Sequence, residues 1–244
     1  MKIVRYHMDS DDSSSDSEEK VVNMDVHDSI IGELEVSNIK SLSLTDSVIN
    51  ISIPGSDELK SISEVITDYR RKIRKLHRGG SANGARGLDS IIAELSTLIK
   101  QQRSAGLVTV TASLLSLQAL AHARRGRVEI MDERIEEALE MDPHCEQAHL
   151  VAGEYSHNLY LRMEDELEKS NALKNAIMHH KDVWKNASSK GAKNNAGYHL
   201  CLELLANENF EEARTLKEEL LESISNPDGI MRVEAIEIPL QGPE

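Results

Sequence analysis

Histidine and cysteine are the side chains whose spacing in this sequence could support chemistry. Cys145 and His149 stand four residues apart in a segment with helical periodicity, so both side chains would lie on one helix face. His157 and the pair His179-His180 are further candidate metal ligands. Zinc sites need three or four ligands in a closed shell, and no second Cys or His pair of suitable spacing accompanies these residues. The sequence therefore predicts no metal site and no cofactor.

A catalytic role for Cys145 would need a histidine base and a third group to orient that base. Cys145 lies between a turn and a helix, where a thiolate is favoured, but the sequence places neither of the other groups. Carboxylates at Glu136-Glu137 and at 164–166 form runs that are typical of an exposed helix face. Two carboxyl groups can act as the acid and the base of a reaction only when they share a cleft and have different environments. We therefore expect a protein that is not an enzyme.

A cluster of cations near the end of a predicted helix could bind an anionic partner; it comprises Arg70, Arg71, Lys72, Arg74, Lys75 and Arg78. Such clusters contact phosphates without sequence preference, so a nucleic acid is one candidate partner. The other interpretations are an acidic protein, the chain's own acidic segment 9–19, or a solvated helix end where positive charge is favourable. The chain carries 42 acidic and 28 basic residues, a formal net charge of −14, which argues against nucleic acid.

The segment 135–153 contains a joint between two helices. Its first helix must end near Met141-Asp142, because Pro143 has no N–H and its ring clashes with the preceding turn. A second run with helical spacing begins at once and includes Ala148 and Val151 on one face. We therefore predict a helical hairpin joint at Pro143.

That joint resembles the tetratricopeptide repeat, a helical hairpin that recurs and stacks into a solenoid. The letters ALEMDP at 138–143 match the usual end of a repeat, and NFEEA at 209–213 resembles the opening of a second helix. Leu115, Ala119 and Gly126 fall where the family has a bulky residue, a small residue and the turn inside the hairpin. The resemblance covers residues 106–225.

The resemblance implies a groove lined by the first helix of each hairpin, which would take a peptide or a partner helix. The matching positions are Ser116, Leu120, Gln147, Leu150, Glu154, His157, Tyr198 and Leu202. These residues are neutral to acidic and partly apolar, which favours a basic or amphipathic helical segment as the partner.

The N-terminal 54 residues differ in character from the rest. Residues 1–19 include the acidic stretch 9–19, which has no hydrophobic residue and is expected to be a disordered linker. Residues 20–54 show a nine-residue repeat whose third place is always β-branched, at Val21, Ile30, Ile39 and Val48. This pattern predicts a small β module, either solenoid-like or a meander, that docks on the helices or mediates self-association.

Two further segments flank the repeats. Residues 55–105 are expected to form two helices, the first capped by Ser56 or Asp57 and the second running over 88–103, joined by the glycine-rich hinge 79–87. Residues 226–244 begin with a turn and are expected to form a strand or a tail.

The predicted fold class is mainly α: antiparallel, tetratricopeptide-like helical hairpins stacked as a solenoid, preceded by the small β module. Only 3% of residues are aromatic, which suits a stack built on aliphatic side chains. No signal peptide or membrane-length apolar run is recognisable, so a cytoplasmic location is expected. The predicted function is a protein-binding adaptor or regulatory subunit, and a nucleic-acid-associated regulator is the alternative.

Overall fold

The computed structural model of the protein describes residues 50–52, 59–78 and 82–239. The acidic segment 9–19 and nearly all of the predicted β module 20–54 lie outside these residues. Within them, Asn50–Ser52 (β1) pairs antiparallel with Leu59–Ser61 (β2), and Ile51 lies opposite Lys60.

The described part of the chain is dominated by helices, which confirms the mainly α prediction. They are α1 (Ile62–Arg78), α2 (Ala82–Ser104), α3 (Val108–Arg124), α4 (Val128–Met141), α5 (Glu146–Arg162), α6 (Glu166–Asn186), α7 (Lys190–Ala206), α8 (Phe210–Ser223) and α9 (Pro227–Glu234).

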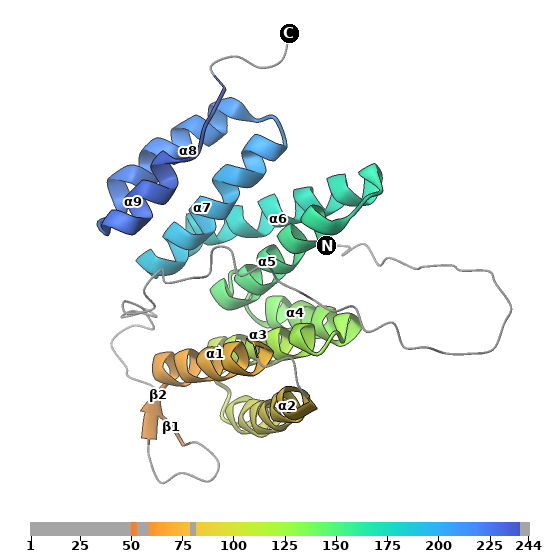
Figure 1. The fold of residues 1–244 in the computed structure, drawn as a ribbon. Coiled ribbons are helices and arrows are strands. Elements are labelled where there is room, and N and C mark those ends of the chain that lie inside the picture. The colour runs from red at the N-terminus through yellow and green to blue at the C-terminus, as the bar shows by residue number, and fades with distance from the viewer. Residues whose placement is uncertain (1–49, 53–58, 79–81, 240–244) are drawn as a thin grey trace, which may run out of the picture.

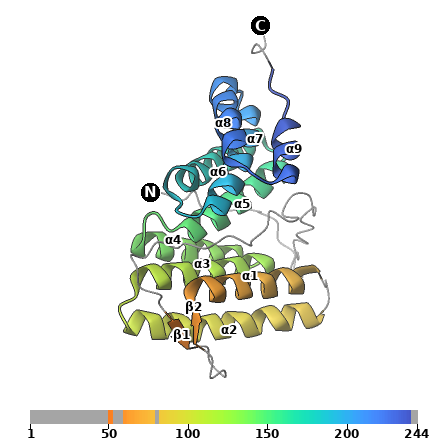
Figure 2. The ribbon, with the colours of Figure 1, turned by 90° about the vertical axis from the view of Figure 1, so that its left-hand side faces the viewer.

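Consecutive helices pack as antiparallel pairs that follow one another along the molecule (Figures 1 and 2). Helix α3 packs on α4, α5 on α6 and α7 on α8, and each pair contacts the next. The odd-numbered helices are also neighbours, because α3 touches both α1 and α5, and α5 touches α7. In Figure 1 the layers run from α1 and α2 at the bottom to α8 and α9 at the top.

The joint predicted at Pro143 is confirmed, since α4 ends at Met141 and α5 begins at Glu146. Gly126 lies in the turn between α3 and α4 with a φ of 72°, a conformation that glycine adopts without strain. Arg127 there donates its backbone N–H to the carbonyl of His122, which satisfies one of the last carbonyls of α3.

Two aliphatic clusters form the larger cores of the stack. One joins α1, α2 and α3 and reaches Cys145 and Ala148 at the start of α5. The other joins α7, α8 and α9 around Leu204 and Leu216, and Trp184 of α6 packs against it. The C-terminal three helices therefore share a core that α6 partly covers.

The expected caps Ser56 and Asp57 lie outside the described residues, and the first helix begins later than expected, at Ile62. The sequence Ser61-Ile-Ser-Glu64 forms a capping box at the end of β2. The Ser61 backbone N–H donates to Glu64 Oε2 at 2.9 Å, and the Glu64 N–H lies 3.4 Å from Ser61 Oγ. This reciprocal pairing fixes the start of α1 at Ile62.

The predicted glycine-rich hinge is largely helical, because α2 already begins at Ala82 and includes Gly84 and Gly87. A Cβ on Gly84 would lie 2.7 Å from the carbonyl oxygen of Leu76, and one on Gly87 would lie 2.7 Å from the Leu76 side chain. These glycines therefore let α1 and α2 approach closely, and only residues 79–81 separate the two helices.

The strand expected after Asn226 is also corrected, because residues 227–234 form helix α9. Asn226 is the N-cap, its side chain accepts a hydrogen bond from the Gly229 N–H, and Pro227 occupies the first helical turn. Proline there lacks only an N–H that would have no partner within the helix.

Candidate binding groove and buried histidine network

Three of the eight predicted groove residues lie in the interior of the stack. Ser116 is fully buried, Gln147 is 4% exposed and Leu150 is 2% exposed. The Ser116 hydroxyl donates to the carbonyl of Ala112 at 2.8 Å and lies 3.6 Å from Cys145 Sγ. All three side chains are covered by the surrounding stack, which corrects the expectation that they line an open groove.

The other five predicted groove residues are partly exposed; they are Leu120, Glu154, His157, Tyr198 and Leu202. They come from α3, α5 and α7, which are successive neighbours in the stack. We call these five residues the inner-face set. Leu120 and Leu202 each pack against an aliphatic cluster, and part of each side chain remains exposed to solvent. The set therefore combines apolar surface with one carboxylate and one imidazole.

Arg70 couples the predicted cation cluster to the inner-face set. Burial lowers the pKa of its guanidinium, whereas the carboxylates of Glu154 and Glu146, both on α5, act to raise it. Burial raises the pKa of Glu146, and Arg70 acts against that increase. The positive charge of Arg70 is thus directed at carboxylates of α5.

The remaining predicted cations are distributed around α1. Arg71 forms an ion pair with Asp68 at 3.1 Å, and Lys72 lies 3.9 Å from Glu94 and over the ring of Tyr69. Arg74 is half-buried and Lys75 is exposed; Arg78 is the last residue of α1. Three of the six cations, Arg70, Arg71 and Lys72, therefore have carboxylate neighbours within the chain.

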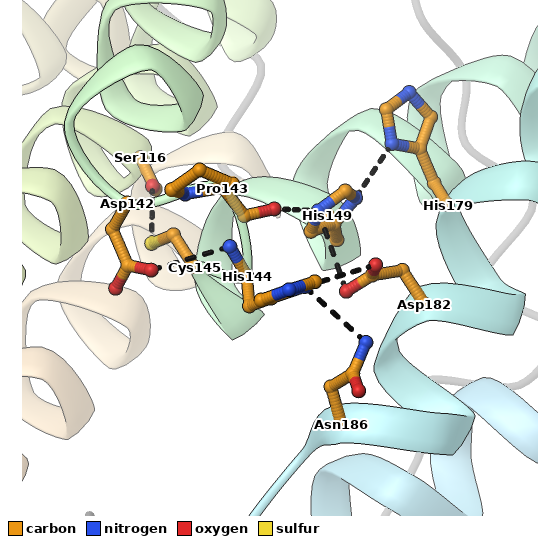
Figure 3. A network of polar contacts seen from close by, with 9 residues as sticks. All are labelled: Ser116, Asp142, Pro143, His144, Cys145, His149, His179, Asp182 and Asn186. Carbon is orange, nitrogen blue, oxygen red and sulfur yellow. Dashed lines mark hydrogen bonds and ion pairs between the residues drawn. The ribbon is translucent and has the colours of Figure 1, made fainter.

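A polar network crosses from α5 to α6 at the start of the second hairpin (Figure 3). His149 Nε2 lies 3.0 Å from the carbonyl oxygen of Pro143, which can only accept, so this nitrogen carries the hydrogen. In a neutral ring His149 Nδ1 is then an acceptor. It lies 2.9 Å from His179 Nδ1, which must donate. The contacts therefore determine the tautomers of both rings.

Asp182 supports the same network from α6. Its Oδ1 lies 3.4 Å from His149 Nε2, and its Oδ2 lies 3.3 Å from His144 Nδ1, which also approaches Asn186. His144 is exposed, whereas His149 and His179 are buried. The network thus extends from the surface to the interior of the hairpin.

A second network is centred on Glu203 of α7, whose side chain is fully buried. Its Oε1 accepts from His157 Nδ1 of α5 at 3.0 Å and from His180 Nδ1 of α6 at 2.8 Å. One carboxylate therefore ties three helices together. Because both Nδ1 atoms donate, the neutral His180 ring has its acceptor at Nε2.

The interior around Glu203 contains ring nitrogens without protein partners. His180 Nε2 and both nitrogens of His199 are buried and have no hydrogen-bond partner among the described residues. The rings of His180 and His199 are stacked, with centroids 5.3 Å apart and planes 20° apart. Gly153 makes room for this arrangement, because a Cβ there would lie 2.7 Å from the His180 ring.

The burial of these groups determines their charge. Burial, reinforced by the neighbouring imidazoles, lowers the pKa of His179 and that of His199 to about 3 each, so both rings are neutral near pH 7. Burial alone would raise the pKa of Glu203, but the hydrogen bonds from His157 and His180 keep it below its ordinary value. At neutral pH Glu203 is therefore a carboxylate, and the rings of His179 and His199 near it carry no charge.

Cys145 is buried at the start of α5 and is not held as a thiolate. Burial raises the pKa of its thiol, although the Ala148 N–H and the Ser116 hydroxyl act in the opposite direction. A thiol with a raised pKa is a poor nucleophile near pH 7.

No group of three or more His, Cys, Asp or Glu side chains among the described residues is arranged to hold a metal ion. None of the described helices is long and apolar enough to cross a bilayer.

Sequence reasoning singled out His149, His157, His179 and His180 but missed His199 and Glu203. The signal for these two was present, since they stand four residues apart on α7 and therefore share a helix face. An acidic residue next to the buried Leu200 and Leu204 would have indicated a buried carboxylate that needs hydrogen-bond donors.

Comparison with protein-family models, curated proteins and solved structures finds no match to this chain.

Proposed function

We propose that the protein is a non-catalytic adaptor or regulatory subunit that binds a helical segment of another protein along the inner-face set. The observation that carries the proposal is the arrangement of α3, α5 and α7 as successive neighbours, each contributing partly exposed side chains. Tetratricopeptide-like repeats, which the sequence resembles, bind peptides and helices with their first helices.

The chemistry of the inner-face set favours an amphipathic partner helix. Leu120, Tyr198 and Leu202 would receive apolar side chains spaced at three and four residues, the spacing of one helix face. Glu154 offers a carboxylate to a cation of the partner, although Arg70 already offsets part of its charge. Specificity would therefore depend on apolar spacing more than on net charge.

Site-specific photo-crosslinking in native extract tests this proposal. A photoreactive amino acid replaces Leu202 in one full-length variant and Leu167 in a control variant. Leu167 is 72% exposed, at the start of α6 and outside the inner-face set. A third variant carries the probe at Lys75, to detect a partner bound to the cation cluster.

The expected result is a discrete protein adduct from the probe at Leu202 and none from the probe at Leu167. Mass spectrometry of the adduct would identify the partner and the segment bound. Adducts formed only from the probe at Lys75, or equally from all three, would contradict binding at the inner face.

A further inference from the structure

The junction of α5 and α6 with α7 combines a small apolar cluster with the histidine networks. The buried aliphatic residues at this contact are Leu150, Val183, Ala192 and Ala196, a smaller cluster than the cores on either side. Ile177 and Trp184 of α6 also pack, partly buried, against the core of α7–α9. The buried residues of that core belong to the C-terminal helices and the segment after them, so these helices can remain folded if the junction opens. The polar contacts therefore add to a limited apolar contact, and their loss weakens the attachment of α7–α9.

The contact between His149 and His179 cannot accommodate a second proton. Its nitrogens lie 2.9 Å apart and share one hydrogen. The other nitrogen of His149 already donates to Pro143. A proton added at His149 Nδ1 would set two N–H groups against each other, so protonation breaks this hydrogen bond.

The Glu203 network has the same property. The Nδ1 atoms of His157 and His180 already donate to Glu203. A proton added to His180 must therefore go to Nε2, which is buried and has no acceptor among the described residues. His199 offers two nitrogens in the same situation. A buried imidazolium without a partner is costly, so both networks favour neutral rings.

We propose that this junction is an acid-operated latch: protonation of the buried histidines detaches helices α7–α9 from α5 and α6 while both parts remain folded. The inference does not depend on the proposed function, because it concerns contacts within the chain. It also assigns a role to the unpartnered nitrogens of His180 and His199.

The charged groups that face the junction do not offset this effect. Asp182 of α6 lies near His149 and His179, and it acts to raise the pKa of His179, but burial outweighs it. Glu203 likewise acts to raise the pKa of His199 and is outweighed. On the α8 and α9 side, Glu212 is paired with Lys181, Lys217 lies near Cys201 and Arg232 lies near Tyr198.

The direction of the pH effect follows from the histidine pKa values. His179 and His199 have pKa values of about 3 in the closed junction and about 6.5 when exposed. The closed form is therefore fully favoured above pH 6.5 and loses stability as the pH falls from 6.5 towards 3. Between pH 7.5 and 5.5 each such histidine favours opening by about tenfold, and two by about 100-fold.

Thiol-labelling kinetics of the full-length variant Val183→Cys at pH 7.5 and 5.5 test the latch, with rates corrected for the pH dependence of the reaction with the unfolded variant. Val183 lies in the buried apolar cluster of the junction, so the introduced thiol should react about 100-fold faster at pH 5.5, reversibly, while Cys145 and Cys201 stay protected in the cores on either side. Adding His199→Phe to this variant keeps a stacked ring without a titrating group, and the increase should be about tenfold smaller. Adding the control His144→Gln, at an exposed histidine, should leave the increase unchanged.

Equal corrected labelling rates of the introduced thiol at the two pH values would overturn the proposal. Labelling of Cys145 and Cys201 in parallel with the introduced thiol would also overturn it, because that pattern indicates global unfolding. An equal pH response with and without His199→Phe would remove His199 from the latch and contradict the assignment.

Discussion

Gly153 shows how one missing side chain determines the geometry of the histidine network. A Cβ at this position would lie 2.7 Å from Cδ2 and Nε2 of His180, a separation that requires the ring to move. His180 is fixed by its bond to Glu203, so it cannot move without breaking that contact. The small residue at this position therefore serves a polar network as well as close helix packing.

The substitution Gly153→Ala should lower the free energy of unfolding by about 1–2 kcal/mol. Alanine gains roughly 1 kcal/mol of helix propensity, but displacement of a buried ring typically costs 1–3 kcal/mol and also disturbs a charged hydrogen bond. Urea denaturation at pH 7.5 measures the change. In the matched control Gly191→Ala the new Cβ meets only Ser189 Oγ at 3.9 Å, so stability should be unchanged or slightly higher. Equal effects at both glycines would refute the steric explanation.

Glu203 is the residue on which the contact of three helices depends. The variant Glu203→Gln should lower the free energy of unfolding by roughly 2 kcal/mol at pH 7.5, since hydrogen bonds to a buried charged group contribute about 1.5–3 kcal/mol. Thermal unfolding followed by circular dichroism measures this loss. Glu222→Gln, at an exposed position on α8, is the control and should have a melting temperature close to wild type. A Glu203 variant as stable as that control would show that the hydrogen bonds contribute little.

At the scale of elements, three turns of the stack share one hydrogen-bonding pattern. The Leu107, Arg127 and Asn209 N–H groups donate to carbonyls five residues earlier. The preceding residue has a positive φ in each turn, 73° at Gly106, 72° at Gly126 and 58° at Glu208. Glutamate is strained in this conformation, so the turn between α7 and α8 contains a local conflict.

Replacing Glu208 by glycine should therefore stabilise the protein by about 1 kcal/mol, the cost of a left-handed conformation for a residue with a Cβ. Urea denaturation is again the measurement. Asn207→Gly provides the comparison, because Asn207 has a φ of −91° and no strain to relieve. The strain explanation would be contradicted if neither substitution raised the stability, or if both raised it equally.

A glycine inside helix α2 allows α1 and α2 to pack closely. The variant Gly84→Ala should destabilise the protein by about 1–3 kcal/mol, because its Cβ would meet the backbone oxygen of Leu76 at 2.7 Å. Asn83→Ala, at the exposed neighbouring position, should be close to neutral. The melting temperatures of the two variants measure the difference. A Gly84→Ala variant that melts at the wild-type temperature would show that α1 and α2 can move apart at no cost.

These elements also show where sequence reasoning succeeded and failed. The helices with strong apolar periodicity and the joint at Pro143 were predictable, because both depend on local chemistry. The glycines of segment 79–87 suggested a flexible hinge, whereas Gly84 and Gly87 lie in α2 and allow close packing. Residues 226–229 suggested a turn, and the same letters also describe an N-cap followed by proline at the first helical position.

The histidine network depends on tertiary structure and was beyond sequence reasoning. His149 and His179 are 30 residues apart, and His157 and Glu203 are 46 residues apart. Only the packing of α5, α6 and α7 brings them together. The burial of Ser116, Gln147 and Leu150 was likewise invisible, because the angle between neighbouring hairpins decides which positions remain open.

At the scale of the whole molecule, the described chain is a succession of helical hairpins with two larger aliphatic cores and a polar junction between them. The N-terminal core holds α1–α3 and the start of α5, and the C-terminal core holds α7–α9. The inner-face set spans both parts, since it runs from Leu120 of α3 to Leu202 of α7. A partner bound along it would therefore also bridge the junction.

Hydroxyl-radical footprinting of the free protein and of its co-purified complex, read out residue by residue, tests most directly whether a partner binds the inner-face set. We expect Leu120, Tyr198 and Leu202 to become protected in the complex, while the exposed Leu167 and Met178 of α6 are oxidised as in the free protein. Protection confined to α6, or to residues 70–78 of α1, with the inner-face residues unchanged, would contradict this expectation.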